Sequence, residues 1–556
     1  MAESLAAFSS LSAIVQTPSE SDIDYDADHE LTKSPSVDSV DYRFAAAQKY
    51  PEHAFEFSSR DTTGRTLELE ESEEDGPWAR STLLSFDGGG VRGYSSLLIL
   101  QALMSSIKRT ETTLGTVPAG TSADSPLIEA SRVKQHFELR RKYSRQPSHD
   151  PFLPHHYFDY IAGASTGGLI AVMLGRLRMS VDEAINEYLD ITSRVYSLRR
   201  RSRKNALTKL VLPNSMREWE ITVRIKHLAL DIKGAETASL EHSPMRKRSI
   251  KRFQSDGDRC KTIVCSLRQD SKHGSMVPFL FRSYADIQTP GQALGTQYPH
   301  AERYKISQVV RATSCSPYYF KLTKLDGRQY CDAGLSLSNP TFEIFRDVDL
   351  NHRQDQRRKR IHRRIGLLLS IGCTTNSSAH IERNRRSNKG FRAYSQLNSW
   401  ASPQEDVHAA MQSLSKGPDP FDYFRFDAKS NLPVLSNEDF SPKKGEPAFV
   451  NKIREATLAY LADPRVQQEI EDCARQLVEW RRQRCVTTRW ENFALGSRFG
   501  CRHEDKSCPQ QQSKTLFESR DQLVEHLRKV HKMPPADAVH YKEIQALVDK
   551  GRTNID

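Results

Sequence analysis

Three glycine-containing stretches of the sequence carry groups that could take part in a chemical reaction. The stretch "GASTGG" (163–168) places Ser165 between Gly163 and Gly167 as G-x-S-x-G, the pattern of a serine held on a sharp turn as a nucleophile. A serine hydroxyl is a weak nucleophile, so it needs a base that takes its proton. A serine at an ordinary helix start would give the same letters, so the motif is informative only together with the others.

The second stretch, "YCDAGLSLSNP" (330–340), offers a carboxylate as that base. Asp332 follows a short apolar run, and a carboxylate held in such a turn can accept the serine proton directly. The alternative is a histidine supported by an acidic residue, as in α/β-hydrolases. No histidine after Ser165 stands in a clear strand-to-loop position, and an isolated Asp332 is also typical of an Asx turn.

The third stretch, "SFDGGGVRGY" (85–94), offers backbone N–H groups. Glycines between a strand and a helix let several N–H groups point at one place, and the helix N-terminus adds positive potential there. The anion could be a phosphate or a transient oxyanion. Gly88, Gly90 and Gly93 also match G-x-G-x-x-G, but the second strand and acidic residue of a dinucleotide site are missing. The absence of GK[ST] excludes a P-loop.

The elements that would position these groups alternate between strands and helices. Short apolar runs bounded by glycines predict buried strands, and longer amphipathic stretches predict helices. This alternation predicts an α/β fold with a mostly parallel sheet. Strands are expected over 81–86, 157–165, 261–267, 279–284 and 364–372, and helices over 94–108, 166–177, after a Ser180/Glu183 capping box, and across 447–490.

The composition divides the chain into parts. Hydrophobic residues make up 37% and the mean hydropathy is −0.63, which indicates a folded body with polar segments attached. The predicted parts are a disordered acidic segment (1–80), a catalytic domain (81–375) with insertions near 109–150 and 199–255, a helical extension (376–490), and a small helical tail (499–556).

The charge distribution favours anionic partners. Residues 1–80 carry 18 acidic and 6 basic side chains, a net charge of −12. Because the whole chain has a net charge of +11, residues 81–556 carry +23. Such a basic body is suited to acidic lipid surfaces or nucleic acid, although dispersed charge that serves solubility is an equal alternative. Nine irregularly spaced cysteines fit a reducing compartment, and no apolar run is long enough to span a membrane. We therefore expect an intracellular, cytoplasmic protein.

Taken together, the three stretches resemble the patatin-like phospholipase family. Two further stretches, "VVRATSCSPYYF" (309–320) and "LLLSIGCT" (367–374), resemble the family and follow in the matching order. The resemblance covers roughly 81–375 and implies a three-layer patatin-like fold with a mostly parallel sheet and helices on both faces. It also implies lipid acyl-ester hydrolysis of phospholipid or another acyl lipid by a Ser–Asp dyad, with no cofactor or metal in catalysis.

The resemblance assigns roles to residues that match the family's motifs. Ser165 would be the nucleophile and Asp332 the general base. Three glycines would supply the oxyanion-hole N–H groups, with an arginine supporting the loop: Gly88, Gly89, Gly90 and Arg92. The remaining motif positions are Gly93, Gly163, Gly167, Ala333 and Gly334.

One position departs from the family pattern. The aspartate turn usually reads Asp-Gly-Gly or Asp-Gly-Ala, whereas here Ala333 follows Asp332. If this position requires a positive φ, alanine would be strained by about 1 kcal/mol or more. The alternative function is therefore a weakly active or non-catalytic lipid-binding scaffold that recruits partners through its tail and basic loops.

Basic stretches offer a route to a membrane without a spanning segment. Each Lys or Arg near an anionic leaflet adds about 1 kcal/mol of attraction, which predicts peripheral membrane association. The same stretches are also typical of nuclear import signals or solvated loops. They lie at 199–204, 245–252 and 357–364.

The tail contains four residues of the types that bind zinc. Cys501, Cys508, His526 and His531 resemble the ligands of a C2H2 zinc finger, and the histidine half fits better than the cysteine half. Six residues separate the cysteines where two to four are usual, and His503 is a substitute ligand. A structural zinc and a protein or nucleic-acid partner are expected; the alternative is a helical hairpin with incidental histidines. A purely nucleic-acid-associated protein would leave the three glycine motifs unexplained.

Overall fold

The structure is a computed structural model. The structure describes residues 76–115, 152–197, 252–255, 259–270, 276–284, 304–315, 322–335, 337–357, 364–373, 404–429, 448–487, 489–505, 508–533 and 541–554. Residues 1–75 of the expected disordered segment, most of both expected insertions, and most of the three basic stretches lie outside the described residues.

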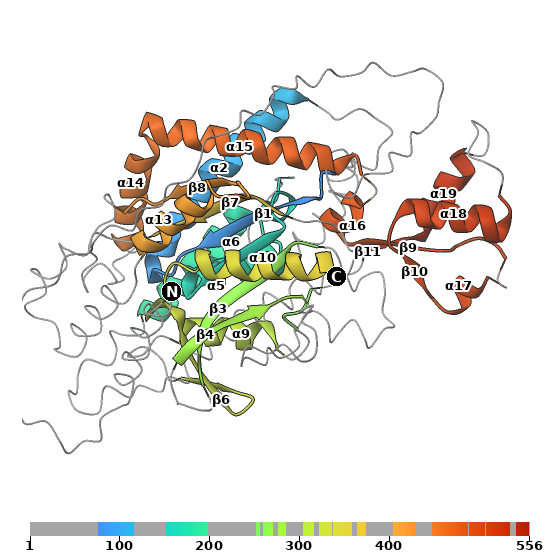
Figure 1. The fold of residues 1–556 in the computed structure, drawn as a ribbon. Coiled ribbons are helices and arrows are strands. Elements are labelled where there is room, and N and C mark those ends of the chain that lie inside the picture. The colour runs from blue at the N-terminus through green and yellow to red at the C-terminus, as the bar shows by residue number, and fades with distance from the viewer. Residues whose placement is uncertain are drawn as a thin grey trace, which may run out of the picture. The chain divides into compact units, whose positions relative to one another are not determined.

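The body is built on a mixed, mostly parallel eight-stranded sheet in the order β5-β6-β3-β2-β1-β7-β8, with β4 paired to β3 (Figure 1). Strands β1, β2, β3, β7 and β8 are joined by parallel pairing, whereas β4, β5 and β6 pair antiparallel. The α/β fold predicted from the alternation is thus confirmed. The strands are β1 Arg80–Phe86, β2 Tyr160–Ala164, β3 Lys261–Gln269, β4 Met276–Arg282, β5 Thr323–Leu325, β6 Arg328–Asp332, β7 Arg364–Ile371 and β8 Asp422–Phe426.

Helices cover both faces of the sheet, which gives three layers. Because side chains alternate along a strand, Leu84 and Phe86 of β1 face one apolar cluster and Leu83 faces the other. The first cluster contains residues of α2 Gly93–Leu114, α5 Thr166–Ala171, α6 Val181–Ser197, α14 Ala448–Leu461 and α15 Pro464–Cys485. The second contains residues of α10 Thr341–Arg357 and α13 Gln404–Leu414.

Local signals placed several helix boundaries. The predicted capping box is present: the Ser180 N–H donates to Glu183 Oε2 at 2.8 Å, and the Glu183 N–H donates to Ser180 Oγ at 3.2 Å. α2 runs to Leu114, beyond the expected end at residue 108, so part of the expected insertion is helical. α9 covers Ile306–Ser314, and α5 continues into a π-helical turn over Val172–Arg176.

The boundary expected at residue 375 does not coincide with an edge of the fold. β8, from the part expected to be a helical extension, pairs in parallel with β7 along the catalytic sheet. α14 and α15 from the same part pack against α2. The extension is therefore one strand and several helices of the same layered body, because the apolar faces of α2 and β7 need a cover.

The tail folds as a small mixed unit around its own core. Strands β9 Ser497–Gly500, β10 Leu516–Phe517 and β11 Arg552–Asn554 form a three-stranded antiparallel sheet, where only helices were expected. Helices α17 Pro509–Gln512, α18 Arg520–His531 and α19 Tyr541–Gly551 accompany it. α16 Trp490–Leu495 precedes it, and Glu491 of this helix pairs with Arg520.

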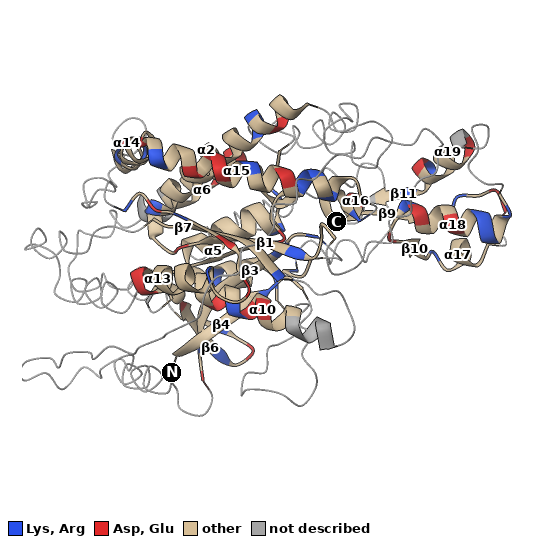
Figure 2. Cartoon of the chain, turned by 45° about the horizontal axis from the view of Figure 1, so that its top comes forward, with Lys and Arg blue, Asp and Glu red and all other residues tan. Residues whose placement is uncertain are grey.

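Charged residues lie mainly on the helices, and the sheet strands are largely uncharged (Figure 2).

Within the part of the chain that the structure describes, no helix is both long and apolar enough to cross a bilayer.

Candidate active site

Ser165 lies on the turn between β2 and α5, in a strained backbone conformation. Its φ of 54° and ψ of −124° are rare for a residue with a side chain, because the Cβ crowds the backbone there. The turn is tight on both sides. A Cβ on Gly163 would overlap the backbone of Gly167, and a Cβ on Gly167 would lie 2.5 Å from the Phe86 and Asp87 carbonyl oxygens. Only glycine at both positions lets the turn reach β1.

Asp332 lies within hydrogen-bond distance of that serine. The Ser165 hydroxyl donates to Asp332 Oδ2 at 2.9 Å, and both residues are buried. Asp332 ends β6, and its Oδ1 accepts the Gly334 N–H at 2.8 Å, which fixes the plane of the carboxylate. The structure therefore brings together the two residues that the sequence placed 167 positions apart, and directs the hydroxyl to a carboxylate instead of a histidine.

The Ser165 backbone has its own support. Its N–H donates to the Thr313 hydroxyl at 2.8 Å, and that hydroxyl donates to the Cys265 carbonyl at 2.5 Å. Thr313 lies on α9, inside the "VVRATSCSPYYF" stretch that the sequence singled out. This stretch therefore contributes a support for the serine turn.

The strain suspected at Ala333 is absent. Ala333 begins a short 3-10 turn, is not among the described residues with positive φ, and its methyl group is buried. The condition under which alanine would strain the turn and tilt Asp332, a positive φ at residue 333, is therefore not met. The next position is the constrained one, because a Cβ on Gly334 would lie 3.2 Å from Asp332 Oδ1.

The glycine-rich loop lies beside Ser165, but its three glycines differ in function. A Cβ on Gly88 would lie 3.0 Å from the Ser165 Cβ, so glycine allows the close approach. The Gly88 N–H, however, already donates to the Ser338 carbonyl at 2.8 Å, so it would have to leave this acceptor to bind an oxyanion. The Gly89 N–H makes a longer bond of 3.3 Å to the Thr166 hydroxyl. Gly90 has φ of 60° and starts a 3-10 turn, where an N–H has no intrahelical acceptor.

Arg92 and Gly93 hold the far end of this loop. Arg92 Nε donates to the Cys373 carbonyl at 3.1 Å, so the arginine ties the loop to the segment after β7. A Cβ on Gly93 would overlap the Tyr188 hydroxyl, which itself donates to the Gly90 carbonyl. Gly93 is therefore required for close packing of α2 against α6.

Sequence reasoning assigned no role to Asp87, yet it is fully buried in an ion pair. Arg425 of β8 donates to both Asp87 oxygens, at 3.0 and 2.6 Å. Burial raises the pKa of Asp87 to about 6, and the adjacent Arg425 guanidinium opposes this rise because it favours the ionised carboxylate. The aspartate directly before the glycine loop was the only feature of the sequence that could have drawn attention to this ion pair. Its partner, Arg425, lies 338 positions away in the sequence.

Replacing Gly167 by Ala is expected to destabilise the protein by about 1–3 kcal/mol, because the new methyl group must displace backbone carbonyls of β1. The free energy of unfolding, measured by urea denaturation, tests this. Gly417→Ala is the milder control, since at this surface turn its Cβ would crowd only the Leu414 carbonyl oxygen, at 3.1 Å, whereas a Cβ on Gly167 would lie 2.5 Å from two carbonyl oxygens. Equal stability of the two variants would contradict the tight contact at Gly167.

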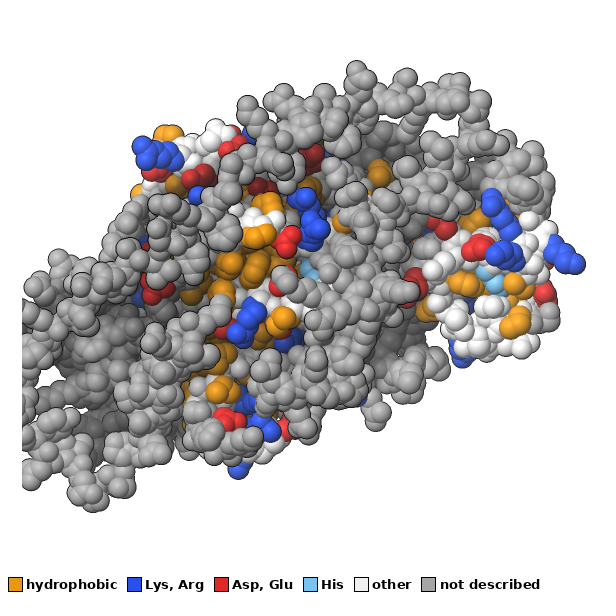
Figure 3. All heavy atoms as spheres, in the orientation of Figure 1, with side chains coloured by type: hydrophobic (Ala, Val, Ile, Leu, Met, Phe, Trp, Pro, Cys, Tyr) orange, Lys and Arg blue, Asp and Glu red, His pale blue; other side chains and the backbone are white. Residues whose placement is uncertain are grey.

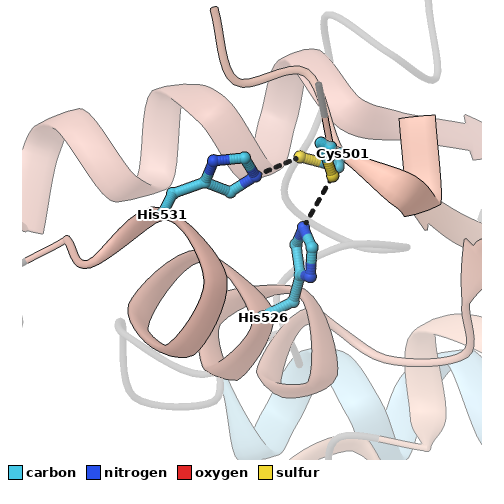
Figure 4. Close-up of side chains that lie close together, drawn as sticks. Cys501, His526 and His531 are labelled. Carbon is cyan, nitrogen blue, oxygen red and sulfur yellow. Dashed lines mark hydrogen bonds between the residues drawn. The ribbon is translucent and has the colours of Figure 1, made fainter. Parts of the chain in front are cut away.

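The four zinc-type residues of the tail also come together. The ligand atoms of Cys501, Cys508, His526 and His531 all lie within 4.8 Å of one another. Cys501 Sγ lies 3.3 Å from His531 Nε2 (Figure 4). Cys508 Sγ lies 3.4 Å from His526 Nε2. His503 is not in this group; its ring stacks on that of His531.

The two sulfur-to-nitrogen distances, 3.3 and 3.4 Å, fit a tetrahedral zinc site. Bond lengths of about 2.3 Å to sulfur and about 2.0–2.1 Å to nitrogen imply ligand-to-ligand distances of about 3.3–3.8 Å. Gln511 Nε2 donates to Cys501 Sγ at 3.5 Å, an outer contact of the kind that orients a thiolate ligand. The residues present therefore fit the metal.

The protein thus combines a layered α/β body with a buried Ser–Asp pair beside a glycine-rich loop. Residues 153–345 match the family model described as patatin-like phospholipase, so the chain contains a patatin-like phospholipase domain. The matched range includes Ser165 and Asp332, whereas the glycine-rich loop of β1 lies before it.

Curated relatives of the chain carry the name of a phospholipase. The chain is 28% identical over 187 residues to human calcium-independent phospholipase A2-gamma, covering 34% of this chain and 21% of that protein. The rabbit protein of the same name is 26% identical over 193 residues, with the same coverage. The match thus spans about a fifth of the length of these relatives. A crystal structure of VipD from Legionella pneumophila is similar with a TM-score of 0.23 and 11% identity over 84% of this chain and 83% of that one, a level that does not establish a shared fold.

Proposed function

We propose that the protein is a serine-dependent lipid acyl hydrolase that cleaves fatty-acyl ester bonds with a Ser165–Asp332 dyad, in lipid degradation or remodelling. The family match and the phospholipase relatives support a lipid hydrolase. The observation that carries the finer proposal is the 2.9 Å hydrogen bond from the Ser165 hydroxyl to Asp332. The strained serine turn supports it, because such strain persists mainly where function requires it.

In the proposed reaction, Ser165 Oγ attacks the ester carbonyl carbon while Asp332 takes the hydroxyl proton. The proton then passes from Asp332 to the alkoxide oxygen of the leaving alcohol, and an acyl-serine remains. Water attacks this ester, and Asp332 takes a proton from the water. The serine oxygen leaves and recovers that proton, and the fatty acid is released.

The negative charge that develops on the carbonyl oxygen needs donors. Gly89 and Gly90 are the proposed donors, because the Gly88 N–H is engaged by Ser338. The Gly89 N–H has only a long bond to a hydroxyl that can rotate away. Such donors matter in the transition state, where loss of one typically costs about 10²–10³ in rate.

The test uses a fluorophosphonate probe and a panel of phospholipid, triacylglycerol and short-chain esters. The wild-type protein is expected to label covalently and to release fatty acid from at least one lipid. Ser165→Ala is expected to lose labelling and at least 10³-fold in turnover, since no acyl-serine can form. If the wild type neither labels nor hydrolyses any ester while binding lipid vesicles, the alternative of a non-catalytic lipid-binding scaffold replaces this proposal.

For the tail, we propose a structural zinc held by Cys501, Cys508, His526 and His531. Four protein ligands leave no open position for a substrate, as is usual for structural sites. No catalytic step involves this metal. Exposed basic side chains lie on the tail (Figure 3), at Arg502, Lys514, Arg528, Lys529 and Lys532. They support the proposed contact with an acidic protein surface or nucleic acid.

Access to lipid is proposed to be by peripheral binding to an anionic membrane surface, in the cytoplasm. The support is the +23 charge of the chain after residue 80.

A further inference from the structure

The segment from α13 to β8, residues 404–429, lies beyond the matched range of 153–345, yet it contacts the glycine-rich loop. The contact comes from the sheet register. Ser85 of β1 is level with Ser370 of β7, and Ser370 is level with Arg425 of β8. The Arg425 side chain therefore crosses β7 and reaches Asp87, two residues after Ser85.

Arg425 is fixed at its far end by several partners. Its guanidinium binds both oxygens of Asp87, the Ser370 hydroxyl at 2.6 Å and the Asp427 carboxylate at 3.0 Å. Its side chain is 9% exposed and that of Asp87 is 0% exposed. A planar fork held at this many points defines the orientation of the carboxylate that it binds.

Asp87 is the last residue before the glycine loop. Contacts that fix Asp87 therefore also restrict the backbone conformation of the loop. Its N–H donates to the Ile371 carbonyl at 3.0 Å, which continues the β1–β7 pairing. Its carbonyl oxygen packs against the serine turn, because a Cβ on Gly167 would lie only 2.5 Å from it. With N–H and side chain both held, the peptide that leads into Gly88 has little freedom to rotate.

A second link from the same segment reaches the loop through Ser338. Gln404 Nε2 donates to the Ser338 hydroxyl at 2.6 Å, and the Ser338 carbonyl accepts the Gly88 N–H. The 404–429 segment thus contacts the start of the loop in two ways. Arg425 binds Asp87 directly, and Gln404 binds Ser338, which in turn binds Gly88.

We propose that Arg425 is a positioning residue for the oxyanion-binding loop and acts through Asp87. This inference rests on the proposed acyl hydrolase function. Arg425 does not touch the reacting atoms, so it affects the donors only through the peptide geometry of residues 87–90. Because those donors bind a charge present in the transition state, the loss of Arg425 lowers kcat and leaves KM nearly unchanged.

The experiment compares wild type with Arg425→Gln, Arg425→Lys, Asp87→Asn and the double variant Asp87→Asn/Arg425→Gln. Hydrolysis of a short-chain ester is measured, and kcat is expressed per active site titrated by complete fluorophosphonate labelling. This normalisation removes the effect of any unfolded fraction. Arg364→Gln, on the neighbouring strand with a 63% exposed side chain, is the matched control and is expected to keep wild-type kcat.

The expected result for Arg425→Gln is a kcat lowered by about 10- to 100-fold at an unchanged KM, the effect of a displaced catalytic group. Arg425→Lys is expected to regain part of that loss, because it keeps the charge and loses the fork. The double variant is expected to be no worse than the worse single variant, since both changes remove the same link.

Three outcomes would overturn the proposal. One is a wild-type kcat per titrated site in Arg425→Gln, and another is independent, additive losses in the double variant. The third is the loss of titratable sites in all Arg425 and Asp87 variants, which would make the pair a folding element only. These outcomes are separable from failure of the hydrolase proposal, in which Ser165→Ala would retain the wild-type rate.

Discussion

The Asp332→Asn variant is expected to hydrolyse esters about 10³- to 10⁴-fold more slowly than the wild type, with KM changed little. Asparagine has the shape of aspartate, and its carbonyl oxygen can still accept the Gly334 N–H that orients this side chain. Its amide group cannot take the proton of the Ser165 hydroxyl at neutral pH. The nucleophile would thus keep its place and lose its base.

Steady-state kinetics with a short-chain ester and the labelling rate with fluorophosphonate check this result. Asp326→Asn is the matched control: it lies on the exposed turn of the same β5–β6 hairpin, where its φ of 50° suits asparagine as well as aspartate. That variant should keep wild-type kcat. A similar rate for Asp332→Asn and the control would remove Asp332 as the base and direct attention to a different proton acceptor.

The second large effect is expected from the tail. The purified protein should contain about one zinc per chain, and chelation should unfold residues 497–554 while ester hydrolysis by the body continues. Among the described residues of the tail, the hydrophobic core contains seven buried side chains, too few to stabilise a unit of this size without a metal ion or another cross-link. Structural zinc contributes about 10–16 kcal/mol of binding free energy in comparable peptides, so its removal should be decisive.

Zinc content by elemental analysis and limited proteolysis of the tail measure this effect. Cys508→Ser and His526→Ala should lose the metal and make the tail sensitive to protease. His503→Ala is the control and should retain the metal, because His503 lies outside the group of four. A metal-free wild type with a protease-resistant tail, or zinc loss in the control, would contradict the proposed ligand set.

Short-range patterns in the sequence predicted much of the sheet. The runs at 81–86, 261–267 and 364–372 correspond to β1, β3 and β7, because buried strands are continuous apolar runs. β5, β6 and β8 were not predicted as strands. Each is short, and β8 reads "DYFRF" with two charged residues, so its place in the sheet follows from pairing with β7 and not from its own composition.

The candidate site shows the same division. Ser165 and Asp332 could be proposed because each stands in a motif with a recognisable turn. The engagement of the Gly88 N–H by Ser338 could not be predicted, since a backbone hydrogen bond leaves no trace in residue types. The Arg425 partner of Asp87 was equally hidden, because a register between distant strands decides which side chains meet.

The pairing of β1 has a consequence for the order in which the protein is made. β1 is synthesised early, but Arg80 pairs with Arg364, and the loop that follows β1 is held by Arg425. The nascent chain therefore carries an apolar strand with an open edge until most of the molecule has left the ribosome. Contacts this distant slow folding, so we expect the candidate site to be among the last features to form. The yield of active protein would then depend on a chaperone that shields the open edge of β1 during translation.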